Sequence, residues 1–207
     1  MTDSYSKRRP LAEFLEWIEK WSQGMMGLAK IDALLNPDRE TKRMKEEALP
    51  VYFYVRRFYQ GQNVSVELTG VEDTPDAKVY DSDGRIIEGL EVTNAYQEIE
   101  AKDFRLRQKL SEGLDLGDYI SQSLSLSLDK YIQKSVLRVL KAKEVARHES
   151  NTSLIVLLNT DFTLDEMATT AIRDEIANAV LDHKFKRIVF FAPNGGLIAE
   201  LPSVQRS

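Results

Sequence analysis

Two carboxylates stand on either side of a strongly predicted hairpin. Asp76 comes at the start of one strand-like stretch and Glu91 lies within the next, with Asp83-Gly84 between the two stretches. An Asp-Gly pair favours a tight turn because both residues tolerate positive φ. We therefore expect residues 77–80 and 86–93 to pair as antiparallel strands.

The length of the turn decides which residues of the hairpin face each other. If Asp83-Gly84 forms a two-residue loop, counting outward places Asp76 opposite Glu91. If Ser82-Asp83 forms the loop, Asp76 lies opposite Gly89, diagonal to Glu91. Either register puts both carboxylates on one face, since side chains alternate with a period of two. Directly opposed Cβ atoms lie about 4.5–5.5 Å apart.

Two carboxylates at this separation suit one hard cation. Mg²⁺ and Mn²⁺ prefer oxygen ligands, and a cation would relieve the repulsion between facing carboxylates. Lys78 and Thr93 each follow a carboxylate by two residues, so both lie on the same face. A lysine there would polarise an attacking water and stabilise charge on a phosphoryl oxygen. The spacing thus indicates metal-dependent hydrolysis, with no organic cofactor.

The pattern around the hairpin predicts a mixed α/β fold. We expect helices in five segments: 11–23, 39–59 (kinked or divided at Pro50), 94–111, 119–139 and 163–179. Apolar residues recur with a helical period in the first and the last two, whereas 39–59 is charged and then aromatic and 94–111 is strongly charged. Strand signals mark six stretches: 64–69, 77–80, 86–93, 154–158, 188–192 and 197–201. A three-stranded meander joined to a βαβ unit implies a mixed central sheet flanked by helices. We expect one compact domain, with an N-terminal helical extension (1–44) on an α/β core (45–207).

The residues and the order of elements together resemble the PD-(D/E)XK superfamily of restriction-endonuclease-like nucleases. Pro75-Asp76 stands where that family starts its second strand, and Glu91-Val92-Thr93 stands where the third strand ends in Glu-X-Lys. Residues 45–160 follow the family's order of helix, three-stranded meander, helix and strand. The resemblance implies a Mg²⁺- or Mn²⁺-dependent endonuclease whose metal is held by the Asp76 and Glu91 carboxylates.

The resemblance also implies further site residues. Members often carry a basic or amide residue on the helix after the meander, for which Gln133 and Lys134 are the candidates. An additional acidic residue would be Glu67, as a third metal ligand, or Glu47 in the preceding helix.

Thr93 departs from the family pattern because it stands where the family has lysine. Members are known to move the lysine to a neighbouring strand, and Lys78 is the natural substitute here. Members are also known to lose activity and to persist as binding domains. Threonine cannot supply positive charge, so we expect weak or absent nuclease activity in the isolated protein.

Composition narrows the class of protein. The 207 residues include no cysteine and two histidines, which excludes thiolate metal sites and disulfides and disfavours a histidine-rich zinc site. No apolar run is long enough to span a membrane and no secretion signal is recognisable, so we expect a cytoplasmic protein without a membrane partner. The net charge of -5 counts against tight nucleic-acid binding but leaves room for a local basic face.

Two functions remain open from the sequence. One is a Mg²⁺-dependent phosphodiesterase acting on nucleic acid, favoured by the facing carboxylates. The other is a non-enzymatic domain on the same scaffold that binds a protein or a nucleic acid, favoured by Thr93 and the acidic charge. Asp76 and Glu91 are also ordinary residues for strand ends. An unrelated small-molecule enzyme has no support, because the sequence has neither a glycine-rich phosphate loop nor a nucleophile elbow.

Overall fold

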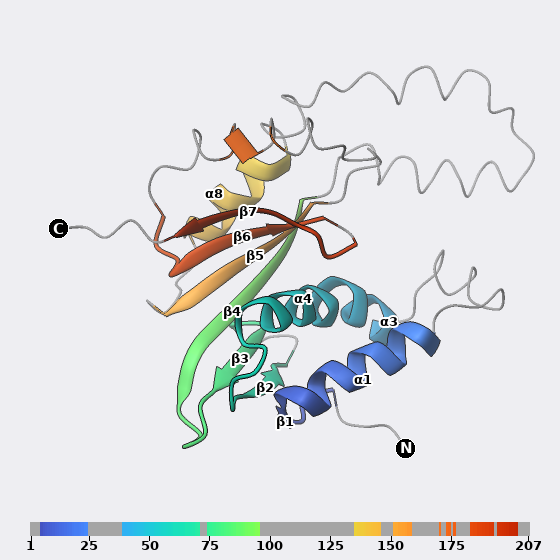
Figure 1. Cartoon of the computed structure of the whole chain (residues 1–207). Helices are drawn as coiled ribbons and strands as arrows, with labels where there is room; N and C mark the ends of the chain where they lie inside the picture. The colour runs from blue at the N-terminus through green and yellow to red at the C-terminus, as the bar shows by residue number, and fades with distance from the viewer. Residues whose placement is uncertain are drawn as a thin grey trace, which may run out of the picture.

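One mixed sheet dominates the computed structural model (Figure 1). The structure describes residues 5–24, 39–70, 74–95, 135–145, 151–158, 170, 173–174, 176, 183–192 and 194–202. Within these residues seven strands neighbour one another in chain order. They are β1 (Arg9–Pro10), β2 (Ser65–Leu68), β3 (Ala77–Tyr80), β4 (Ile86–Ala95), β5 (Thr152–Leu158), β6 (Arg187–Phe191) and β7 (Leu197–Pro202). The pairs β4–β5 and β5–β6 are parallel, and the other pairs are antiparallel.

Helices cover both faces of the sheet, as Figure 1 shows. The helix predicted over 39–59 is present but contains a π-helical turn, η2, ahead of Pro50. Pro50 has no N–H to donate to the preceding turn, and it stands in the first turn of α4, directly after the π-helical turn. The elements are α1 (Leu11–Gly24), α3 (Arg39–Arg43), η2 (Met44–Ala48) and α4 (Leu49–Phe58) on one side, and α8 (Leu137–Val145) on the other.

The sheet separates two apolar cores, and β4 and β5 contribute to both. Leu90 and Val92 of β4 pack in the core beneath α1 and α4. Ala95 packs in the core beneath α8, together with Val136 and Leu140. Every residue of β5 is buried, as expected for a strand covered on both faces. The alternation along β4 therefore directs Glu91 and Thr93 towards α8.

All six predicted strands are present, β4 is longer than predicted, and β1 was not predicted. The helix expected from residue 94 is wrong at its start, because Asn94 and Ala95 continue β4 and pair with Leu157 and Leu158. The rest of that segment, and residues 119–134 of the next helix, lie outside the described residues. Of the helix predicted over 163–179, the four residues that are described are helical.

The N-terminal segment joins the same sheet and core. Arg9 pairs with Val66 at the edge of the sheet, and Phe14 and Ile18 of α1 are buried among the residues of β2 and α4. Figure 1 shows α1 lying beside α4 over the meander. None of the described helices is both long and apolar enough to cross a membrane.

Candidate functional site

The turn between β3 and β4 differs from both predicted registers. Asp81 pairs with Arg85 through an N–H···O bond of 3.0 Å, so the loop has three residues, 82–84. The Asp81 carboxylate accepts the N–H groups of Asp83 and Arg85 at 2.9 and 2.8 Å. The predicted two-residue loop is wrong because the favoured tight form needs positive φ at both central residues, and here Gly84 alone adopts it.

A β-bulge then brings Asp76 and Glu91 opposite each other, as predicted. Tyr80 pairs with Ile86, whereas Val79 pairs with Glu88, so Ile87 is the extra residue. Beyond the bulge, Ala77 pairs with Leu90, and continuing by one residue sets Asp76 opposite Glu91. Without the bulge, the three-residue loop would have turned the two carboxylates to opposite faces.

Pro75 and Gly89 fit together at this end of the hairpin. A Cβ on Gly89 would lie 2.9 Å from Cγ of Pro75 and 3.0 Å from Oγ1 of Thr152. Glycine is therefore needed for the proline to lie against β4. This contact positions the start of β3, and with it Asp76.

Asp76 is a half-buried carboxylate with an unusual protonation equilibrium. Its Oδ2 accepts the N–H of Val92 at 2.7 Å. Burial, and next the negative charge of Glu91, raise its pKa to about 6, while the Val92 bond and Lys143 act in the opposite direction. At neutral pH the site thus keeps a charge that its surroundings disfavour.

Glu91 is more deeply buried than Asp76 and is paired with a lysine from α8. Its side chain is 4% exposed, and its Oε1 accepts a hydrogen bond from Nζ of Lys143. Its Oε2 is buried and has no hydrogen-bond partner in the described part of the chain. This oxygen of a buried carboxylate can therefore still accept a hydrogen bond or bind a cation.

Lys143 is the site residue that the sequence analysis missed. Gln133 and Lys134, its candidates for this helix, lie outside the described residues. A signal was available, because Val136, Leu140 and Lys143 follow one another at spacings of four and three and therefore share a helix face. That face carries the buried Val136 and Leu140, so a lysine there is directed at the sheet.

The third acidic residue near Asp76 is Glu47 of η2, one of the two alternatives from the sequence. Its charge contributes to the raised pKa of Asp76. Its Oε2 accepts bonds from the Tyr5 hydroxyl at 3.0 Å and from Nη2 of Arg43 at 3.1 Å. Arg43 also donates to the backbone oxygen of Thr69 at 2.9 Å, so Glu47 is held beside the start of β3 by a charged network.

Glu67, the other alternative, is engaged elsewhere. It belongs to β2 and pairs with Lys78 of β3. Its Oε2 accepts the Tyr80 hydroxyl at 2.5 Å and lies 3.9 Å from Nε of Arg8. These contacts hold its carboxylate at the β1 edge of the sheet, which does not suit the third metal ligand that the sequence analysis assigned.

Lys78 and Thr93 take the expected positions on the sheet without joining the carboxylates. Lys78 is half-buried, pairs with Gly89 and forms no ion pair with Asp76 or Glu91 within the described residues. Thr93 is half-buried beside Val156 of β5. Among the described residues, the cation bonded to these carboxylates is Lys143, from the helix layer.

A second buried glutamate, Glu88, lies on the opposite face of β4. Its Oε1 accepts the hydroxyls of Tyr54 at 2.8 Å and Ser153 at 2.5 Å, and Nζ of Lys186 lies 3.4 Å away. Its Oε2 accepts the Tyr59 hydroxyl. Burial, together with the bonds and charge of Glu88, raises the pKa of both tyrosines, which keeps them protonated as donors.

The donor set near Asp76 fits a cation that keeps part of its water shell. Within the described ranges, no group of three or more histidine, cysteine, aspartate or glutamate side chains is placed to hold a metal ion. Mg²⁺ is commonly held by one or two protein carboxylates, with water and substrate oxygens completing its shell. Asp76 and the unpartnered Oε2 of Glu91 match that requirement.

No family model, curated protein or solved structure matches the chain. The chemistry of the site is therefore inferred from the positions of its own residues.

Proposed function

We propose that the face of the sheet carrying Asp76 and Glu91 binds Mg²⁺ or Mn²⁺ and hydrolyses phosphodiester bonds in nucleic acid. One observation carries the proposal: two carboxylates oppose each other on neighbouring strands, and one buried oxygen of Glu91 has no partner in the described chain. The chain order α4, β2, β3, β4, α8, β5 also supports a restriction-endonuclease-like scaffold as part of the proposal.

The electrostatics of the pair support a cation at this position. Asp76 has a raised pKa because it is buried beside the charge of Glu91. A positive charge between the two groups would favour both ionised carboxylates. When bound there, a divalent cation would polarise the scissile phosphate and lower the pKa of an attacking water.

Lys143 would supply the positive charge that Thr93 cannot. Its ammonium is bonded to Glu91, so it lies beside the carboxylates without needing any rearrangement of the sheet. Positioned there, it would stabilise negative charge on a phosphoryl oxygen. Loss of one such group typically lowers a rate by about 10²–10³. In this proposal Lys143 takes the role that the sequence analysis gave to Lys78.

A cleavage assay tests the proposal. Single- and double-stranded DNA and RNA are incubated with Mg²⁺ or Mn²⁺ and the native chain, Asp76→Asn, Lys143→Met or Lys78→Met. We expect cleavage by the native chain, and a loss of about 10² or more in Asp76→Asn and Lys143→Met. Lys141→Met is the matched control, because Lys141 lies on the same helix and is exposed. Equal activity in Lys141→Met and Lys143→Met would contradict the assigned role of Lys143.

A specific observation also favours the second function, a non-enzymatic domain that binds a protein or nucleic acid. The bond from Lys143 already neutralises Glu91, as a metal ion would. On this alternative the buried pair only stabilises the fold. The absence of cleavage by both the native chain and Thr93→Lys, with Mg²⁺ and with Mn²⁺, would support it.

A further inference from the structure

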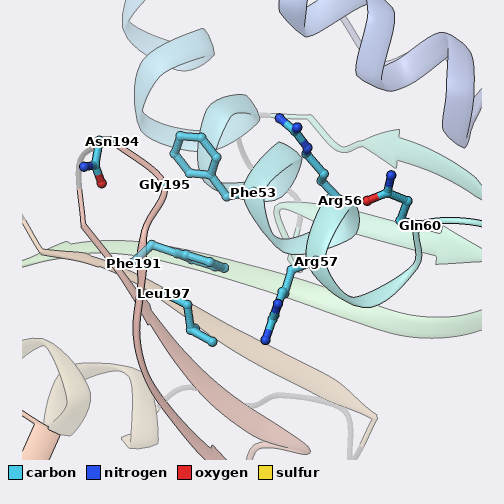
Figure 2. Close-up of a pocket in the computed structure, with 8 residues that line it drawn as sticks. All are labelled: Phe53, Arg56, Arg57, Gln60, Phe191, Asn194, Gly195 and Leu197. Carbon is cyan, nitrogen blue, oxygen red and sulfur yellow. The ribbon is translucent and has the colours of Figure 1, made fainter.

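A pocket of about 360 Å³ lies between α4 and the β6–β7 hairpin. Figure 2 shows its two sides: Phe53, Arg56 and Arg57 come from α4, while Phe191 and Leu197 come from the hairpin. Phe53, Phe191 and Leu197 belong to the core beneath α4. The pocket therefore lies on the opposite face of the sheet from Glu91, and an assignment here does not rest on the proposed function.

Two arginines place positive charge at the rim of this pocket. Arg56 and Arg57 are exposed neighbours at the end of α4. Nη1 of Arg56 donates to the Tyr52 hydroxyl at 2.6 Å. Neither guanidinium forms an ion pair with any carboxylate among the residues that the structure describes. In a chain with a net charge of -5, this is a local excess of cations.

The apolar side of the pocket is held in a fixed shape. Gly195 has a φ of +83°, and a Cβ there would lie 2.4 Å from Cε1 of Phe53, so the hairpin turn presses directly against the ring. The Phe53 ring also packs 6.0 Å from Phe191 and 5.7 Å from Tyr52, centroid to centroid. Such a preformed wall lowers the entropic cost of binding a flat ligand.

A polar side chain completes the pocket beside the aromatic wall. Oδ1 of Asn194 accepts the N–H of Gly196 at 2.9 Å, which leaves its amide NH₂ as a donor. The pocket thus combines two guanidinium groups, one half-buried aromatic ring and an amide donor. Guanidinium groups bind phosphate through paired hydrogen bonds, and nucleobases stack on aromatic rings.

We propose that this pocket binds a nucleoside monophosphate unit. The phosphate would lie against Arg57, whose side chain ends on the side of Leu197 in Figure 2, and the base would lie against Phe53 and Leu197 with an acceptor on its edge facing Asn194. The same unit occurs as a free nucleotide and as the phosphorylated end of a nucleic-acid strand. Both sources present the same phosphate and base to the pocket.

Calorimetric titration of the full chain tests this assignment. The titrants are AMP, GMP, CMP and UMP, with adenosine, ribose 5-phosphate and inorganic phosphate as incomplete ligands. We expect at least one nucleotide to bind at least about tenfold more tightly than each incomplete ligand, since a charged hydrogen bond or a stacked base each contributes about that factor. Inorganic phosphate binding as tightly as every nucleotide would overturn the assignment.

Substitutions at the rim locate the binding without disturbing the core. Arg57→Gln changes an exposed side chain and is expected to weaken nucleotide binding by about tenfold. Arg56→Gln is expected to weaken it less, because Figure 2 shows that side chain pointing away from Arg57. Arg85→Gln makes the same chemical change at an exposed turn position outside the pocket and should have no effect. Unchanged affinity in the Arg56→Gln/Arg57→Gln double variant would overturn the proposal.

A second pair of titrants distinguishes the two sources of the ligand. A 5′-phosphorylated tetranucleotide is compared with the same tetranucleotide lacking the phosphate, and both with the free nucleotide. Tighter binding of the phosphorylated strand supports the pocket as a site for strand ends. Tighter binding of the free nucleotide supports it as a nucleotide site. If neither the phosphorylated strand nor the free nucleotide binds while cleavage activity is intact, this inference is overturned and the proposed function stands.

Discussion

Glu88 and Glu91 are three residues apart on β4, are almost equally buried and have opposite environments. Glu88 is 1% exposed and receives hydrogen bonds or an ion pair from four side chains on the α4 face. Glu91 is 3% exposed, bonds to Lys143 on the α8 face and keeps one oxygen without a partner among the described residues. A buried acid whose acceptors are filled stabilises a fold, whereas one with a free acceptor is suited to a ligand.

The origin of the partners strengthens this contrast. The hydroxyls that reach Glu88 belong to residues 34, 29 and 65 positions away in the chain. Glu88 therefore ties α4 and β5 to β4. Glu91 has a repelling neighbour instead, because its charge raises the pKa of Asp76 across the hairpin. Glu88 therefore lowers the free energy of the folded state. Glu91 instead repels the charge of Asp76 in the folded state.

The largest expected effect separates the two glutamates directly. Glu88→Gln should lower the free energy of unfolding by about 3 kcal/mol, because its amide NH₂ would face hydroxyl donors and leave Lys186 without its carboxylate. Glu91→Gln should lower it by about 1 kcal/mol or less, since it also relieves repulsion with Asp76. Urea denaturation of both variants measures the difference. Equal losses of unfolding free energy in the two variants would contradict the contrast between Glu88 and Glu91.

The next largest effect is a gain in stability when Asp76 is replaced by asparagine. The pKa is near 3.8 when the chain is unfolded and about 6 when it is folded, so the folded state binds the proton more tightly. The free energy of unfolding should therefore fall as pH rises from about 4 to 6, and stay lower above this window. Asp76→Asn removes this loss and should stabilise the chain at pH 8 by about 2 kcal/mol.

Thermal denaturation from pH 4 to pH 8 checks the sign. The native chain should lose stability across that window relative to Asp76→Asn, whose Oδ1 can still accept the Val92 N–H. A stability difference between the two chains that does not change with pH would contradict the raised pKa of Asp76.

A smaller effect concerns the competition between Lys143 and a divalent cation. Lys143→Met removes the ammonium beside Glu91 and Asp76, so Mn²⁺ should bind about tenfold more tightly, or about 1.4 kcal/mol. Lys141→Met should bind Mn²⁺ as the native chain does. Calorimetric titration with Mn²⁺ measures both. Weaker binding in Lys143→Met would show that the charge of Lys143 does not oppose that of the bound cation.

The smallest expected effect is that of Lys78→Met. Lys78 has no ion pair with either carboxylate within the described chain, so its removal should change the free energy of unfolding by less than about 0.5 kcal/mol. The pH dependence attributed to Asp76 should remain. A larger pH dependence in Lys78→Met, measured by denaturation between pH 4 and pH 8, would make Lys78 a cation of the site, because loss of a nearby cation raises the pKa of Asp76 further.

The sequence predicted the strands well because their period of two is local information. It predicted the facing of Asp76 and Glu91 through a turn that the structure does not have. Nothing in the pattern marks Ile87 as the bulged residue, since a bulge depends on how loop and strand lengths are reconciled across a pair.

The remaining site residues depend on contacts between distant elements. Glu47 reaches the start of β3 through a π-helical turn whose position the sequence does not reveal. Lys143 lay on the apolar stripe of its helix, but its partner depends on which strand that helix covers. The Glu88 network joins three elements, so no local pattern could have predicted it.

The bulge at Ile87 has a consequence for the lengths that this hairpin tolerates. The number of residues from Ala77 to its partner Leu90 is even. Regular pairing uses residues two at a time, so a loop of three residues leaves one strand residue without a partner, and that residue is Ile87. Deleting Ile87 alone would leave a regular ladder with both acids on their original face. Deleting one residue of β3 while the bulge remains would turn Asp76 into the apolar core. An insertion or deletion in this hairpin therefore keeps Asp76 and Glu91 on one face only if the bulge and the strand lengths together preserve the pairing of these two residues.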